Sequence, residues 1–240
     1  MLLSLPILNS GFTLLTVVTV YLFYRLTGSQ RRVLVGLVGW VLFTGAVAAT
    51  GFFRNSQALP PRLAFVMLPM LVAGLLLGCG SVGARLRATT SLEGLHCFQG
   101  LRILVEVVFL HELYRAGYLA REVTYLGHNF DIIPGIIGPV VGYLVYRRKL
   151  LGRRWSVAYQ YFGIAVLTST IALAVLSTPS PYQQLGQVQP TVAIFYLPFV
   201  WLPAVVAPLM LWAHFISLGV LHERGNHSPA APPESSSDRR

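Results

Sequence analysis

The sequence has little charge for its length. Only 11% of its 240 residues are charged, whereas about a quarter of the residues in a soluble domain are charged. This shortage excludes an ordinary soluble domain, which presents charged side chains to water. Hydrophobic residues make up 55% of the chain, and the mean hydropathy is +0.64. We therefore expect an all-α protein whose helices are embedded in a lipid bilayer.

The sequence also lacks the residues and motifs of several enzyme classes. Its two cysteines, Cys79 and Cys97, suit neither a disulfide framework nor a zinc site, and we expect them to pack in the interior. The only lysine, Lys149, lies between apolar stretches, which excludes a retinal Schiff base inside a membrane helix. The P-loop, HExxH and GxSxG motifs are absent, so ATPase, zincin and esterase chemistry lack their residues. We predict no metal site.

The positive charge of the chain does not indicate a nucleic-acid-binding protein. The net charge is +10 and the isoelectric point is about 10.1, values that suggest nucleic acid in a soluble protein. Here the arginines stand in short clusters between apolar stretches, which is the positive-inside pattern of membrane proteins. We therefore expect no nucleic-acid partner.

Seven apolar stretches reach or approach the length that a membrane helix needs, which is about 20 residues. The fifth is short and rich in glycine and proline. We predict a single polytopic helix bundle of about seven transmembrane helices over residues 1–221. Residues 222–240, rich in serine and proline, are predicted to form a disordered cytoplasmic tail. The predicted spans are Leu5–Tyr24, Val33–Phe53, Leu63–Val82, Leu95–Leu119, Ile132–Tyr146, Trp155–Leu176 and Val192–Leu221.

Basic residues alternate between rich and poor segments along the chain. The segments after the odd-numbered stretches carry thirteen, and the other side of the predicted membrane carries four. Because cytoplasmic loops are enriched in arginine and lysine, this pattern predicts an outer N-terminus, a cytoplasmic C-terminus and a location in the cell inner (plasma) membrane. The thirteen are Arg25, Arg31, Arg32, Arg85, Arg87, Arg147, Arg148, Lys149, Arg153, Arg154, Arg224, Arg239 and Arg240; the four are Arg54, Arg62, Arg115 and Arg121.

The fourth stretch is the one that carries charge within it. On a helix, Gln99, Arg102 and Glu106 lie within about a 60° sector. Arg102 and Glu106 are four residues apart, the spacing of an ion pair along one helix face. His111 falls in a different sector near the outer end. Ionisable groups inside a membrane are costly and often functional, but a pair that only holds the helix inside the bundle is an equal alternative.

Polar residues also stand just before the fifth stretch, in the segment EVTYLGHNFDIIPG. Asn129 or Asp131 can cap the helix that follows, and the alternative is that both face a ligand at the outer mouth. The series Gly135, Gly138 and Gly142 lets a neighbouring helix or a ligand approach closely. This segment is therefore a second candidate part of a site.

The last stretch combines prolines with a histidine. Pro198, Pro203 and Pro208 recur every five residues, and each can bend a helix. His214 follows them, and His96 stands at the entrance of the fourth stretch on the same side of the predicted membrane. Two histidines at one depth on two helices can hold a haem axially. We predict no cofactor, with haem on His96 and His214 as the alternative.

Three of these segments together resemble a group of uncharacterised bacterial multi-pass membrane proteins that share an NFD-containing loop and a proline-rich last helix. They are the helix with Arg102 and Glu106, the loop VTYLGHNFDIIPG and the segment LPFVWLPAVVAPLMLWAHFISL. The resemblance covers residues 94–221 and implies no activity. The chain departs from the group's pattern at Leu126 and His128, where glutamate and arginine are expected. The positions to which the resemblance gives weight are Arg102, Glu106, Asn129, Asp131 and His214.

Our first functional hypothesis is transport or binding of a small anionic or protonatable ligand, with a site between the fourth, fifth and seventh stretches. Arg102 would bind an anionic group or pair with Glu106. Glu106 and His111 would be linked to protons, and Asn129 and Asp131 would gate the outer mouth. The candidate site residues are Gln99, Arg102, Glu106, His111, Asn129, Asp131 and His214.

Two other functions fit the same residues. One is a membrane-embedded redox enzyme or a haem- or quinone-binding subunit, with His96 and His214 on haem or a quinone near Arg102. The other is a structural accessory subunit of a membrane complex, in which Arg102 and Glu106 only hold helices together. The sequence does not decide between the three, and it indicates no oligomeric state.

Overall fold

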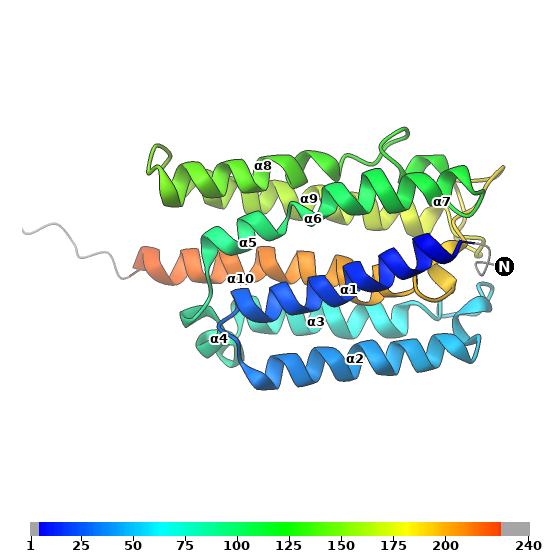
Figure 1. Cartoon of the computed structure of the whole chain (residues 1–240), viewed down its shortest axis with the longest axis horizontal. Helices are drawn as coiled ribbons and strands as arrows, with labels where there is room; N and C mark the ends of the chain where they lie inside the picture. Colours follow the sequence, from blue (N-terminus) through cyan, green and yellow to red (C-terminus); the bar gives the residue numbers. More distant parts are fainter. Residues whose placement is uncertain (1–4, 227–240) are drawn as a thin grey trace, which may run out of the picture.

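The chain folds into a bundle of long helices whose axes are roughly aligned with one another (Figure 1). The computed structural model describes residues 5–226, and all regular secondary structure in that range is helical. The predicted all-α fold class is therefore confirmed. The long unbroken helices are α1 (Pro6–Leu26), α2 (Arg31–Ala49), α3 (Ala64–Cys79), α9 (Arg153–Leu176) and α10 (Ala207–Asn226).

Three rods of the bundle contain a π-helical turn, and α10 belongs to one of them. The rod Leu92–Arg115 is built from α5 (Leu92–Phe98), α6 (Leu101–Leu104), the π-helix η4 (Val105–Leu110) and α7 (His111–Arg115). The helix α8 (Ile132–Gly142) continues into the π-helix η6 (Tyr143–Arg147), and the π-helix η8 (Leu202–Val206) leads into α10. Such turns are rare and concentrate at functional sites. The short connecting elements are η2 (Phe52–Arg54), η3 (Ser81–Gly83), α4 (Ala84–Ala88), η5 (Arg121–Val123) and η7 (Ala193–Phe195).

Five helices are long and apolar enough to cross a membrane. The helix α3 joins them only together with the segment Ser81–Ala88, which bends away from it by 73°. The rod Ile132–Arg147 is apolar but shorter. Every predicted span thus overlaps a helix, whereas length and composition support five or six crossings within residues 5–226. The five are Pro6–Leu26, Arg31–Ala49, Leu92–Arg115, Arg153–Leu176 and Leu202–Arg224.

The last predicted span differs from the expectation at both ends. Continuous helix begins near Leu202 rather than at Val192. Pro203 occupies the first turn of this helix, where proline is favoured because the N–H that it lacks would have no partner there. At the other end α10 continues to Asn226, so residues 222–226 are helical and not part of a disordered tail. The rest of the predicted tail, residues 227–240, lies outside the described residues.

The helix α10 is the centre of the bundle, and α2 lies at its edge (Figure 1). Within their most apolar windows, 78% of the residues of Leu202–Arg224 are buried, but only 17% of those of Arg31–Ala49. Close packing of α10 on α3 depends on Gly74, because a Cβ there would collide with the indole of Trp212. The same indole donates a hydrogen bond of 2.5 Å to the carbonyl of Met70.

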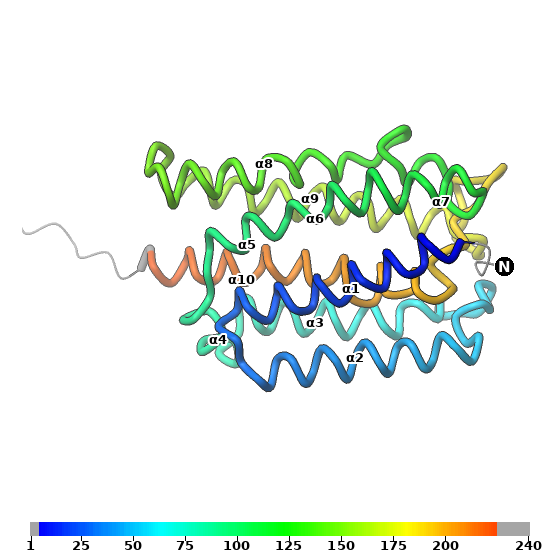
Figure 2. Tube along the Cα trace, in the orientation of Figure 1, coloured from blue at the N-terminus to red at the C-terminus, as the bar shows by residue number. Residues whose placement is uncertain are grey.

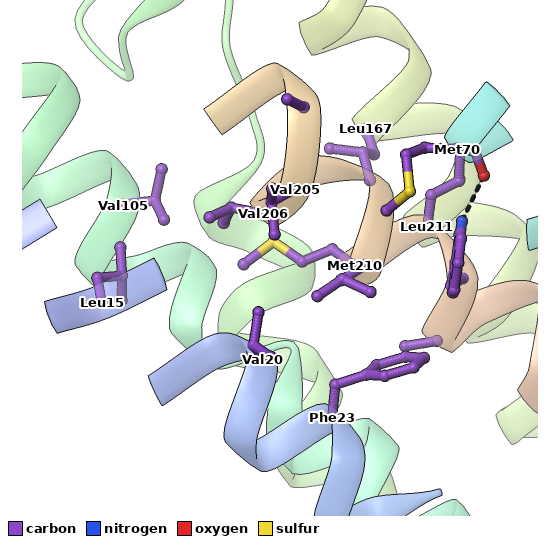
Figure 3. Close-up of a cluster of buried hydrophobic side chains, with 14 of the residues drawn as sticks. Leu15, Val20, Phe23, Met70, Val105, Leu167, Val205, Val206, Met210 and Leu211 are labelled. Atoms are coloured by element: carbon purple, nitrogen blue, oxygen red, sulfur yellow. Dashed lines mark hydrogen bonds between the residues drawn. The ribbon is translucent and has the colours of Figure 1, made fainter. Parts of the chain in front are cut away.

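Large apolar side chains fill the space around α10. Figure 3 shows α1, α3 and α10 meeting there, with the sulfur atoms of both labelled methionines in the same cluster. The residues are almost fully buried, and inside a lipid bilayer such side chains hold helices together through van der Waals packing rather than through transfer out of water. The labelled members are Leu15, Val20, Phe23, Met70, Val105, Leu167, Val205, Val206, Met210 and Leu211.

A proline in α10 provides the attachment point for the peripheral helix α2. Pro208 has no N–H, so the carbonyl of Ala204, four residues earlier, cannot receive the α-helical hydrogen bond. The indole of Trp40 in α2 donates to that carbonyl at 2.9 Å. In return, the indole of Trp201 donates to the carbonyl of Val41 at 3.2 Å. The two bonds hold α2 against the centre, where it can be followed along the chain trace in Figure 2.

The outer surface of the bundle is apolar. On α2, for example, Val35, Leu42 and Phe43 are exposed, which is the arrangement that a helix facing lipid requires. Cys79 and Cys97 are exposed as well. The prediction that the cysteines pack in the interior is therefore wrong, because both lie on outward-facing sides of their helices.

Candidate functional site

Polar side chains gather inside the bundle where the rod Leu92–Arg115 meets α8, α9 and α10. Each of the residues that carry them is at most 4% exposed. Buried polar groups are costly unless they are paired, and ionisable groups within a membrane usually mark function. The buried groups are His96, Gln99, Arg102, Glu106, Asn129, Asp131, Ser156, Tyr159, Gln160, His214 and Ser217. This set contains every predicted site residue except His111.

Arg102 pairs with the carboxylate at the start of α8. Its Nη1 atom lies 3.5 Å from Oδ1 of Asp131, and its Nη2 atom donates a hydrogen bond of 3.4 Å to the carbonyl of Gly163 in α9. The predicted pairing of Arg102 with Glu106 is wrong: no ion pair joins them among the described residues. Four-residue spacing aligns side chains on an α-helix, but the π-helix that begins at Val105 displaces the next side chains around the axis.

Glu106 is held instead by Asn129, whose side chain makes four hydrogen bonds in this part of the site. The Nδ2 atom of Asn129 donates to Oε1 of Glu106 and to the carbonyl of Val123, both at 2.8 Å. Its Oδ1 atom accepts from the hydroxyl of Thr170 in α9 at 2.8 Å and from the N–H of Asp131 at 2.9 Å. A backbone N–H only donates, so this last bond fixes which end of the amide is oxygen.

The same contacts decide the capping alternative for this segment. Asp131 occupies the N-cap position of α8 but its side chain makes no capping hydrogen bond, because it faces Arg102. The carboxamide of Asn129 instead closes a local turn on the N–H of Asp131. Both side chains are therefore directed into the interior, as the site interpretation requires.

Several atoms of this cluster make no hydrogen bond. They are Oε2 of Glu106, Oδ1 of Asp131, and Nε and Nη1 of Arg102. The cluster holds one guanidinium and two carboxylates, so it is negative overall when both carboxylates are ionised. An unpaired buried oxygen costs about 1–3 kcal/mol, and such atoms need an explanation in a folded protein. Groups that receive a proton or a ligand are one such explanation.

Two histidines form the other half of the site. Nδ1 of His96 lies 2.8 Å from the carbonyl of Leu92 and therefore donates to it. Its Nε2 atom then accepts from the carboxamide of Gln160 at 3.0 Å, and the oxygen of that carboxamide accepts from Nδ1 of His214 at 2.6 Å. The hydroxyl of Ser156 also lies 3.0 Å from Nε2 of His96. Gln160 thus fixes both imidazoles in one tautomer.

The two halves meet at Gly163. Its carbonyl accepts the hydrogen bond from Arg102, and a Cβ at this position would collide with the imidazole of His214. The absence of a side chain on Gly163 therefore allows His214 and Arg102 to approach α9 together. Nε2 of His214 has no hydrogen-bond partner.

The space between the two imidazoles is filled by side chains. Gln160 is hydrogen-bonded to both, and the ring of Tyr159 packs against both, with centroid distances of 5.1 Å to His96 and 5.6 Å to His214. The Tyr159 hydroxyl donates to the carbonyl of Pro134 at 3.0 Å. A haem held axially by this pair would have to displace Gln160 and Tyr159.

His111 is not brought into the cluster. It lies nearer the end of the rod, where its ring stacks on Tyr125 with a centroid distance of 5.5 Å and Nδ1 lies 3.1 Å from the Tyr125 hydroxyl. Glu112 and Arg115 form an exposed ion pair of 3.2 Å nearby. Gln99 is buried but donates to the carbonyl of Met210 at 3.1 Å, apart from the carboxylates.

A cavity of about 280 Å³ reaches the carboxylates from the side of α3 and α9. Glu106, Asp131 and Thr170 line it, and its other walls are mostly apolar. Residues of the loop before α3, including Arg62, and of the loop after α9 line its outer part. The cavity gives the buried carboxylates a connection to the surface of the bundle.

No protein family, curated protein or solved structure matches this chain. The interpretation of the site therefore rests on its own geometry and chemistry. The resemblance inferred from the NFD-containing loop and the last helix stays a prediction.

Proposed function

We propose that this chain is a proton-linked transport or binding protein for a small molecule, located in a bacterial inner membrane. The cluster of Arg102, Glu106, Asn129 and Asp131 would be the core of a site between the fourth, fifth and seventh membrane segments. The single observation that carries the proposal is a buried carboxylate, Glu106, with one oxygen free of hydrogen bonds and a cavity beside it.

The proposal includes seven crossings, an outer N-terminus and a cytoplasmic C-terminus. It counts α3 with its bent extension and the shorter rod Ile132–Arg147 as crossings beside the five longer helices. Two observations support it. Basic residues alternate from loop to loop, and the start of α1 and the end of α10 lie at opposite ends of the bundle (Figure 1).

In this function Glu106 binds and releases the proton, and the neighbouring residues hold the Glu106 carboxylate in place. Asn129 positions one carboxylate oxygen and leaves the other free. Arg102 offsets the charge of Asp131, so protonation of Glu106 removes the remaining negative charge of the cluster. Protonation of Glu106 therefore changes the charge beside a ligand in the adjoining cavity, and with it the affinity for that ligand. His96 and His214, fixed by Gln160, position α5, α9 and α10 around this group.

Proton movement into liposomes tests the proposal. Purified protein is reconstituted with a pH-sensitive dye in the lumen, and a potassium diffusion potential drives protons inward. We expect acidification faster than in protein-free liposomes, and a roughly hundredfold loss of the protein-dependent rate in Glu106→Gln, as for other essential proton-transfer groups. Glu112→Gln is the matched control, since Glu112 lies in the same rod but on the exposed side, and it should keep the rate.

Two results would count against this function. One is a wild-type rate equal to that of protein-free liposomes. The other is a rate in Glu106→Gln equal to that in Glu112→Gln, which would favour the accessory-subunit alternative, in which the buried charges only hold helices together.

A further inference from the structure

The cavity beside Glu106 is apolar along its walls and acidic at its inner end. Its walls include Met67 and Leu71 of α3 and Leu167 of α9. The inner end has the carboxylates of Glu106 and Asp131, each with one oxygen that accepts no hydrogen bond. Both residues are at most 4% exposed. Such a space suits a molecule with an apolar body and one hydrogen-bond-donating head.

The charges around the cavity favour a cation over an anion. Arg102 is not among the residues that line it, and its guanidinium is paired with Asp131. The lining does include Arg62, but that guanidinium donates to the carbonyl of Phe52 at 2.7 Å and lies 4.6 Å from the centre of the Phe52 ring. The inner end is therefore negative when both carboxylates are ionised. An anion, expected from the sequence because of Arg102, would meet two carboxylates first.

The depth and the walls of the cavity indicate what the part of the ligand beyond its charged head must be like. Glu106 lies nine residues before the end of its rod at Arg115, so its carboxylate is well inside the bundle rather than at its end. The lining of the cavity includes Leu68 and Val175, both of which are exposed at the surface of the bundle. The apolar body of a ligand can therefore enter from the lipid side and still place its head beside the carboxylates.

We propose that this cavity binds a protonated lipophilic amine, with its ammonium group between Glu106 and Asp131 and its apolar body against α3 and α9. A primary ammonium has three N–H donors, which suit the two oxygens that accept no hydrogen bond, Oε2 of Glu106 and Oδ1 of Asp131. A quaternary ammonium has none. A cavity of about 280 Å³ is at the lower end of ligand sites, so the body has the size of a phenylalkyl group. This inference rests on the proposed function, because both depend on Glu106.

The amine and a proton compete for the same place. The charged or titratable groups that face Glu106 are Arg102 on its own rod and Asp131 at the start of α8, with Tyr159 of α9 and His214 of α10 beyond them. A proton on Glu106 removes the negative charge that attracts the ammonium group. Binding should therefore weaken as the pH falls, and binding of the amine should release a proton.

Equilibrium dialysis with a matched series of ligands tests the inference. The probe is phenylbutylamine, compared with phenylbutyrate, phenylbutanol and phenylbutyl trimethylammonium, all with purified wild-type protein in detergent. We expect the primary amine to bind at least about tenfold more tightly than the other three, the difference that one charge-assisted hydrogen bond provides. Equal or tighter binding of phenylbutyrate, or no binding of the amine, would overturn the inference.

Two variants test separately how the carboxylate of Glu106 and the apolar walls of the cavity contribute to binding. Glu106→Gln should weaken binding of the amine by about tenfold or more, and Glu112→Gln should not change it. Met67→Trp fills the cavity without touching a carboxylate and should also abolish binding, while circular dichroism confirms that each variant is folded. Unchanged binding in Glu106→Gln or in folded Met67→Trp would contradict the inference. Proton flux without amine binding would overturn this inference alone. Amine binding without proton flux would overturn the transport part of the proposed function and leave this inference standing.

Discussion

The helix α2 and the rod Leu92–Arg115 are both long and apolar enough to cross a membrane, yet they differ in nearly every other respect. In its most apolar window α2 is 17% buried and the rod is 50% buried. The helix α2 is one unbroken α-helix without charge after its first turn. The rod contains a π-helix and buries both Arg102 and Glu106.

The difference shows where a membrane protein can keep ionised groups. A helix at the edge of the bundle faces lipid, where nothing pairs a charge. The rod instead has protein on its inner side, and Asp131, Asn129 and Gly163 supply partners from two other segments. Charge within an apolar stretch thus indicates a central helix, and irregular backbone at the same place indicates that the helix serves a site.

The largest effect should come from removing the buried cation. In Arg102→Met the carboxylate of Asp131 loses its partner while still buried, so we expect a loss of about 3–5 kcal/mol in the free energy of unfolding. Arg115→Met, in the same rod, removes an arginine that is 65% exposed and should cost at most about 1 kcal/mol. Unfolding in mixed micelles with increasing SDS measures both.

A second substitution sharpens this result. Adding Asp131→Asn to Arg102→Met removes the uncompensated charge, so it should recover most of the lost stability. If Arg102→Met were no more harmful than Arg115→Met, the buried pair of Arg102 with Asp131 would not contribute as described.

Replacing glycine by alanine should change the free energy of unfolding in opposite directions at the site and in α2, with smaller effects than the loss of Arg102. In Gly163→Ala the new methyl group collides with His214, and we expect a loss of about 1–3 kcal/mol from overpacking. In α2, a Cβ on Gly39 meets nothing within 4 Å. Gly39→Ala should therefore stabilise the protein by about 0.5–1 kcal/mol through helix propensity. Effects of the same sign in the same unfolding assay would remove the distinction between site and periphery.

Much of the fold could be predicted from the sequence, because apolar length and periodicity determine where helices form. Each of the seven predicted stretches overlaps a helix. The irregular backbone could not be predicted. The π-helix at Val105 has no signature among its apolar residues, and it decides that Arg102 pairs with Asp131 rather than Glu106.

The site was partly predictable for a related reason. Charged residues in an apolar stretch are visible in a sequence, so Arg102 and Glu106 could be found. Gln160 could not, since one glutamine in α9 has the same appearance whether it faces lipid or two histidines. The four-residue spacing of Ser156 and Gln160, with Gly163 three residues later, is the signal that places them on one face.

The central claim is that Glu106, on the buried side of the rod, holds an exchangeable proton. Infrared difference spectroscopy between acidic and alkaline buffer measures it directly, because a protonated carboxyl group has its own carbonyl-stretch band. We predict that acidification produces a component of this band that is present in the wild type and in Glu112→Gln, is lost in Glu106→Gln, and is suppressed by phenylbutylamine. The same band in Glu106→Gln, at full intensity, would contradict the account.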